Sequence, residues 1–134
     1  SEAEWEYTCR AGSQTLFHWG DTLPSGKGDE WEYDESDEAT IPTVNRFGLS
    51  SMGAYSEVCA DILHDDYTDA PTDGSAWTTG GDPRKWRVAR GGAYENYPWQ
   101  GLGEWVWLLS AHRLMEGAGG AETNVRPALS LPEE

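Results

Sequence analysis

Positively charged residues are scarce in this chain. Its 134 residues carry nine lysines and arginines against 24 aspartates and glutamates, which gives a formal charge of −15. Nucleic acids and anionic membranes are bound through positive charge, so this balance argues against both as partners. The acidity favours solubility and is compatible with a hard cation such as Ca²⁺.

Long apolar runs and targeting signals are also missing. No stretch approaches the roughly 18 apolar residues that would cross a bilayer, and no secretory signal pattern is visible. A chain of this length can build one modest core. We therefore expect a single domain over residues 1–134.

Sulfur is the third scarcity. The chain has two cysteines, Cys9 and Cys59, without CxxC spacing. Two are too few for a disulfide framework. Two buried thiols are the simplest interpretation; a single disulfide and a catalytic pair are the alternatives.

Glycine, proline and tryptophan are plentiful, with 16, seven and eight residues respectively. The glycines and prolines predict a loop-rich domain with few long helices. In Val88–Tyr94 a buried-looking strand runs into a glycine pair and an aromatic ring, and a segment rich in tyrosine and tryptophan follows. Such a segment is typical either of a binding surface or, at Trp105–Leu109, of a buried strand.

A few segments carry regular patterns. Residues 1–10 predict a helix, since Ser1 and Glu4 form a capping box and Trp5 with Cys9 makes an apolar stripe. Further along, strands are predicted at Tyr55–Leu63, Trp86–Ala89 and Val125–Leu129, and a long loop at His64–Pro83.

Several blocks, taken in order, resemble the formylglycine-generating enzymes, the sulfatase-modifying-factor superfamily. The blocks are Ser1–Tyr7 (TEAEWEY in the family), Phe17–Asp21 (YPWGD), Asn45–Leu49 (NxFGL), Glu57–Asp61 (the end of GNVWEWCAD), Val88–Tyr94 (VLRGGSW), Ser110–Arg113 (SAxR) and Asn124–Leu129 (GFRPVL). The resemblance implies an α+β, irregular, loop-rich C-type lectin-like fold with small antiparallel sheets and few helices. It also implies that the family's N-terminal portion is missing from these residues.

The chain departs from the family's oxidising enzymes at the site of chemistry. Those enzymes carry two cysteines shortly after RGGSW, which bind copper and the substrate cysteine; the window Tyr94–Arg113 has none. The iron-dependent branch uses histidines of a separate domain, and His18, His64 and His112 lack metal-motif spacing. We therefore expect neither copper nor iron.

A calcium loop is a further family feature. The matching positions are Ser51, Gly53, Tyr55 and Glu57, with one residue deleted near Met52. Serine in place of a carboxylate weakens such a site, whereas Glu57 can still ligate. Calcium is the one cofactor that the resemblance leaves open, and an ordinary turn is the alternative.

One branch of the superfamily consists of variable proteins of bacterial and phage diversity-generating retroelements, in which the residues after RGGSW bind ligands without catalysis. By position and composition, the expected ligand-binding residues are Glu95, Asn96, Tyr97, Trp99, Gln100, Glu104, Trp105, Trp107, His112 and Met115. Arg90 and Arg113 are expected to tie the framework to acidic loops.

The resulting hypothesis is a non-catalytic module that binds a protein or small-molecule ligand. The alternatives are a truncated or degenerate oxidoreductase acting on a sulfatase cysteine, and a decayed fragment. The compartment stays open between the cytoplasm and display on a cell or phage surface.

Overall fold

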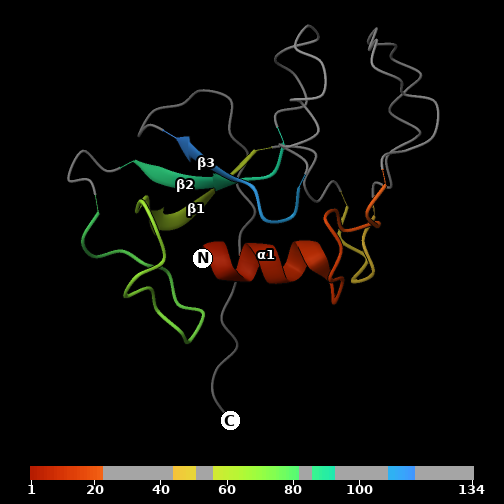
Figure 1. Cartoon of the computed structure of the whole chain (residues 1–134), viewed down its shortest axis with the longest axis horizontal. Coiled ribbons are helices and arrows are strands. Elements are labelled where there is room, and N and C mark those ends of the chain that lie inside the picture. The colour runs from red at the N-terminus through yellow and green to blue at the C-terminus, as the bar shows by residue number, and fades with distance from the viewer. Residues whose placement is uncertain (23–43, 51–55, 82–85, 93–108, 117–134) are drawn as a thin grey trace, which may run out of the picture.

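The computed structural model describes residues 1–22, 44–50, 56–81, 86–92 and 109–116. Its regular elements are α1 (Glu2–Arg10), β1 (Glu57–Ile62), β2 (Arg87–Arg90) and β3 (Arg113–Glu116). The three strands form an antiparallel sheet in the order β1-β2-β3, and α1 packs against β1 and β2 (Figure 1). The described part is thus α+β, with loops joining its elements. No helix within it is long and apolar enough to cross a membrane.

The predicted helix is confirmed, and its ends follow from local chemistry. The Ser1 hydroxyl accepts a hydrogen bond from the Glu4 backbone N–H at 3.1 Å, and the Glu4 carboxylate accepts in return from Ser1, which completes the capping box. The helix ends where Ala11 takes a left-handed conformation (φ 45°) and donates its N–H to the Tyr7 carbonyl.

The core lies between α1 and the sheet. Trp5 and Cys9 meet Cys59 of β1 and Val88 of β2 there. Glu2 shares this helix face and is equally buried, because positions two, five and nine lie on one side of a helix. A carboxylate therefore occupies the edge of the core.

Strand β1 confirms the predicted alternation, and its inward face is partly acidic. Glu57, Cys59 and Asp61 are buried, whereas the residues between them are not. Asp61 accepts hydrogen bonds from the Glu2 N–H at 2.7 Å and from the Trp77 N–H at 2.9 Å. Partners of this kind offset the cost of burying a charge.

Strand β3 was not predicted. It pairs with β2 in continuous register, from Arg87 opposite Glu116 to Arg90 opposite Arg113. The strand predicted at Val125–Leu129 lies outside the described residues.

The predicted loop after β1 is confirmed over residues 64–81, which contain no helix or strand. It is bonded to the sheet and to the start of the helix: the Ile62 N–H of β1 donates to the Trp77 carbonyl at 2.8 Å, and the hydroxyl of Ser1, the N-cap of α1, donates to the Gly74 carbonyl at 2.7 Å. The rings of His64 and Trp77 stack with centroids 3.4 Å apart.

Candidate functional site

The candidate site is the connection between β2 and β3. Arg90 and Arg113 lie opposite each other in the sheet, so the whole segment 91–112 begins and ends at paired positions. A turn of about two residues would join such strands. The segment is therefore far longer than the pairing of the strands requires. Extra length of this kind is found in binding loops as well as in linker segments.

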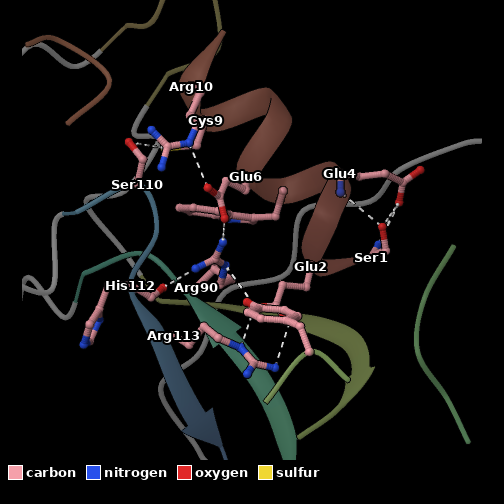
Figure 2. A network of polar contacts seen from close by, with 12 residues as sticks. Ser1, Glu2, Glu4, Glu6, Cys9, Arg10, Arg90, Ser110, His112 and Arg113 are labelled. Carbon is pink, nitrogen blue, oxygen red and sulfur yellow. Dashed lines mark hydrogen bonds and ion pairs between the residues drawn. The ribbon is translucent and has the colours of Figure 1, made fainter. Parts of the chain in front are cut away.

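Most residues of the expected binding surface belong to this segment. Eight of them lie outside the described residues: Glu95, Asn96, Tyr97, Trp99, Gln100, Glu104, Trp105 and Trp107. The structure describes the two ends of the segment and the groups that hold them. We call Gly91–Gly92, which follow β2, the departing root, and residues 109–112, which precede β3, the returning root. Figure 2 shows this polar network between α1 and the sheet.

Arg90 joins the two roots. Its side chain is fully buried, with the guanidinium 5.4 Å from the centre of the Trp5 ring. It forms ion pairs with Glu6 and, at 3.5 Å, with Glu2, and it donates to the His112 carbonyl at 2.6 Å (Figure 2). The departing strand is thereby bonded directly to the returning one.

Arg113 holds the same acid from the other side. Its Nε lies 2.7 Å and its Nη2 lies 3.0 Å from the two oxygens of Glu2. The guanidinium covers the Tyr67 ring at 4.6 Å, and the Tyr67 hydroxyl donates to Glu2 at 2.8 Å. Burial, followed by the contact with Glu2, raises the pKa of Tyr67 to about 12.

The expectation for these two arginines needs a correction. They do serve the framework, but the acids they hold in the described part are Glu2 and Glu6 of α1 and not residues of acidic loops. A helix is a more rigid support than a loop. Because two guanidiniums bind the Glu2 carboxylate, Glu2 is the centre of the network.

The returning root is also anchored through Ser110. Its side chain is buried, its N–H donates to the Leu16 carbonyl at 3.0 Å, and its hydroxyl oxygen lies 3.8 Å from the Cys9 sulfur. The Cys9 thiol of α1 thus contacts the returning root directly.

Both cysteines are free and buried, which confirms the interpretation as two buried thiols. Burial raises the pKa of Cys59 to about 12 and also raises the pKa of Cys9. Because the thiolate is the reactive form, the raised pKa values disfavour both sulfurs as nucleophiles near neutral pH.

His112 and Met115 are the described members of the expected binding surface. His112 is half-buried, and its ring points away from the network (Figure 2). Burial and the nearby Arg90 lower its pKa, which favours the neutral imidazole at neutral pH. Met115, on β3, is 65% exposed.

The calcium prediction remains a prediction. Ser51, Gly53 and Tyr55 lie outside the described residues. Glu57 is buried, and its Oε2 accepts a hydrogen bond from the Trp5 indole at 2.5 Å, so a cation there would have to share this carboxylate with Trp5. Within the ranges that the structure describes, no three histidines, cysteines or acids gather closely enough to hold a metal ion.

Sequence reasoning missed the acids that organise the site. Glu2 is the third member of the helix stripe formed by Trp5 and Cys9, and Arg90 follows the buried Val88 and Ala89 at the end of β2. An acid and a base, each at a position that predicts burial, were the available signal that the two form a pair.

Comparison with known families agrees with this architecture. The model of the sulfatase-modifying factor enzyme 1-like domain matches residues 1–104, which include the helix, β1, β2 and the departing root of the segment. No curated protein is matched. Since the match covers most of the chain, the protein belongs to the formylglycine-generating enzyme, or sulfatase-modifying factor, superfamily.

Proposed function

We propose that this protein is a non-catalytic binding module, built on a scaffold like that of the formylglycine-generating enzymes. The segment after Arg90-Gly91-Gly92 is its recognition surface for a protein or small-molecule ligand. The proposal rests on the base of this segment, where its two ends are held together. Arg90 and Arg113 lie opposite each other in the sheet, and the Arg90 guanidinium donates a hydrogen bond to the His112 carbonyl.

Holding the two ends of the segment together matters because a binding loop needs a rigid support. The groups that fix the base come from α1 and the sheet: Glu2, Glu6 and Cys9 on the helix, and the two arginines on the strands. None of them belongs to the segment between the roots. Residues between the two roots can therefore change without removing these contacts, as a variable recognition surface requires.

The composition of the segment supports recognition. Tyr97, Trp99, Trp105 and Trp107 offer large, rigid contact areas, and the interspersed Glu, Asn and Gln residues offer adaptable hydrogen bonds. This combination, together with the family assignment, favours the variable-protein branch of the superfamily as the finer proposal.

The state of the two cysteines also favours a binding module over an oxidoreductase. The segment contains no cysteine, and the protein's two thiols are buried in the core with raised pKa values. Oxidation of a substrate cysteine through a Cu(I)–thiolate site needs accessible sulfur ligands. The alternative, a degenerate oxidoreductase, has no described residue in its favour.

The proposal is tested by ligand screening with matched tryptophan variants. The wild-type protein, Trp99→Ala and Trp86→Ala are applied to an array of proteins and glycans. Trp86 is the control, since it lies outside the segment and is 37% exposed. We expect Trp99→Ala to weaken a bound ligand at least about tenfold, as for a central aromatic anchor, and Trp86→Ala to bind normally.

Folding is followed in parallel by near-ultraviolet circular dichroism and thermal melting. A Trp99→Ala protein that melts well below wild type would place Trp99 in the core and contradict the proposal. A second assay measures oxidation of the cysteine in a peptide with the sulfatase motif CxPxR, in the presence of Cu(I). Oxidation that is lost in Cys9→Ser or Cys59→Ser would restore the enzyme hypothesis.

A further inference from the structure

A cavity lies on another part of the molecule, beyond the C-terminal end of α1. Its volume is about 320 Å³, and it is walled by residues 12–15, 18–20 and 44–46. Figure 1 shows the two chain segments that supply these residues side by side, next to the last turn of the helix. None of the residues that line it belongs to the segment proposed for recognition.

The wall formed by residues 44–46 is fixed to the helix by Asn45. The buried Asn45 amide nitrogen donates to the carbonyls of Thr8 and Cys9, at 2.6 and 3.3 Å. Its oxygen accepts from the N–H groups of Phe47 and Leu49, at 3.0 and 3.1 Å. All these bonds are internal, so the wall exists without a ligand.

The opposite wall is equally well held. Arg10, at the end of α1, donates to the Thr15 carbonyl at 2.9 Å, and Phe17 and Gly20 exchange backbone hydrogen bonds at 3.0 and 3.2 Å. Together the two walls make a preformed pocket, which lowers the entropy cost of binding.

Trp19 gives the cavity a flat apolar surface. Its half-buried ring stacks on Phe17, with centroids 4.7 Å apart and planes within 5°, and the His18 ring meets its edge at 4.9 Å. The indole N–H donates to the Thr22 carbonyl at 3.1 Å. Trp19 is thus immobilised, and what it offers a ligand is ring surface.

Arg46 gives the cavity an available positive charge. Arg10, Arg90 and Arg113 all pair with acids, and Arg87 donates to the Ala60 carbonyl. Arg46 is exposed and has neither kind of partner within the described part of the chain. In a chain with a formal charge of −15, a guanidinium without an acid is notable. A planar guanidinium is suited to bidentate binding of a carboxylate.

We propose that this cavity is a binding site for a small aromatic carboxylate, whose carboxylate pairs with Arg46 and whose ring lies against Trp19. The volume is at the lower end of the range for ligand pockets, roughly 300–1,000 Å³, and suits a compound with a single ring. The site is separate from the recognition segment and does not depend on the function proposed for it.

Benzoate is the probe for this site, with two comparators. Benzamide keeps the ring and lacks the charge, whereas cyclohexanecarboxylate keeps the charge and lacks the planar ring. Each is titrated into ¹⁵N-labelled protein at constant ionic strength, and the Trp19 indole N–H resonance is followed. We expect saturable shifts with benzoate in the millimolar range, and binding at least about tenfold weaker with benzamide, which loses the bidentate ion pair.

Three variants locate the site. Arg46→Gln is expected to weaken benzoate binding about as much as removing the ligand's charge does. Arg87→Gln is the matched control, because Arg87 lies outside the cavity on β2, and it should bind as wild type. Trp99→Ala should also bind normally, which keeps the outcome independent of the recognition surface.

The proposal is overturned if benzoate causes no saturable shift at Trp19. It is equally overturned if Arg46→Gln and Arg87→Gln bind benzoate alike, or if benzamide binds as tightly as benzoate. The resonances of Thr8 and Cys9 report whether Arg46→Gln keeps the helix end intact, so loss of the fold cannot be taken for loss of the ligand.

Discussion

At the scale of single residues, Arg90 is a buried cation that contacts both the helix and the returning root. Its guanidinium is fully buried and reaches Glu2, Glu6, the His112 carbonyl and the Trp5 ring. Removing Arg90 leaves Glu2 with Arg113 and Glu6 with Arg10, so both acids keep one cation. It also takes the donor away from the His112 carbonyl. Arg90 is thus important for stability because two acids and a carbonyl each lose one partner.

We therefore expect Arg90→Met to lower the free energy of unfolding by about 2–3 kcal/mol. The matched control is Arg10→Gln, which breaks a half-exposed pair with the same Glu6 and the hydrogen bond to the Thr15 carbonyl, and should cost about 1 kcal/mol. Urea denaturation followed by tryptophan fluorescence measures both. Similar losses in the two variants would show that Arg90 is no more important than a surface arginine.

The sequence reveals apolar burial better than polar burial. Burial of Trp5, Cys9 and Cys59 follows from spacing and residue type alone. Burial of Glu2 does not, because the arginines that compensate it arrive from strands remote in the chain. The pattern within a helix identifies its inward face, whereas the partner that makes an inward acid tolerable is set by tertiary structure.

At the scale of elements, the end of α1 shows how a loop completes a helix. The last carbonyls of a helix lack partners within it, and Asn45 supplies one donor group to two of them, Thr8 and Cys9. The same side chain accepts two N–H groups of its own turn. One amide therefore joins the end of α1 to the turn that forms one wall of the cavity.

Asn45→Ala should lower the free energy of unfolding by about 2–3 kcal/mol, since several buried groups lose their partners together. Asn45→Asp is the sharper comparison: it retains the acceptor and sets a negative charge against carbonyl oxygens at the negative end of the helix. We expect the aspartate to be at least as destabilising as the alanine in chemical denaturation. A clearly more stable aspartate would mean that the turn depends on the acceptor alone.

The loop after β1 gives a second test at this scale. Gly74 and Gly81 both have positive φ, at 81° and 69°. A Cβ at Gly74 would meet nothing within 4 Å, whereas at Gly81 it would lie 2.6 Å from an Ile62 side-chain carbon and 2.8 Å from the Leu63 carbonyl. The two positions therefore share the conformational strain and differ in the clash.

We expect Gly74→Ala to cost about 1–2 kcal/mol, the strain of a left-handed alanine. Gly81→Ala should cost about 1–3 kcal/mol more, the usual cost of overpacking. Thermal melting of both variants gives the difference. Equal losses would show that the loop shifts away from β1 without penalty.

Elements could be predicted wherever a local signal exists. The capping box locates α1, and alternation locates β1. Strand β3 has only four residues, Arg113–Glu116, and its sequence RLME has no strong strand preference. It becomes a strand because β2 offers it an edge and Arg113 is held by Glu2, neither of which is visible in its own sequence.

At the scale of the whole molecule, α1 connects everything described. Its first turn carries Glu2, to which both arginines of the segment base are bonded, and its last turn carries the carbonyls that Asn45 caps. The proposed recognition surface and the proposed carboxylate site are thus mounted on one helix. The hydrogen bond from the Ser110 N–H to the Leu16 carbonyl joins the returning root directly to the loop of the cavity.

The core that α1 covers also predicts how stability depends on pH. Burial raises the pKa of Cys59 from 9.0 to about 12, raises the pKa of Cys9, and with Glu2 raises that of Tyr67 from 10.0 to about 12. The folded state thus keeps these groups protonated at pH values where the unfolded chain ionises. Their contribution to stability is complete below about pH 9 and is lost as the pH rises towards 12.

The free energy of unfolding should therefore fall between pH 9 and 12, with up to about 1.4 kcal/mol per pH unit for each buried thiol. The contribution of Tyr67 should be smaller, because this residue is 56% exposed and solvent screens its contacts. Cys59→Ala removes one of them, so this variant should be less stable at pH 8 through lost packing and yet show a shallower decline above pH 9. Tyr67→Phe should flatten the decline only above pH 10. Urea denaturation at several pH values gives these slopes, and parallel profiles for wild type and Cys59→Ala would show that the buried thiol does not cause the alkaline loss.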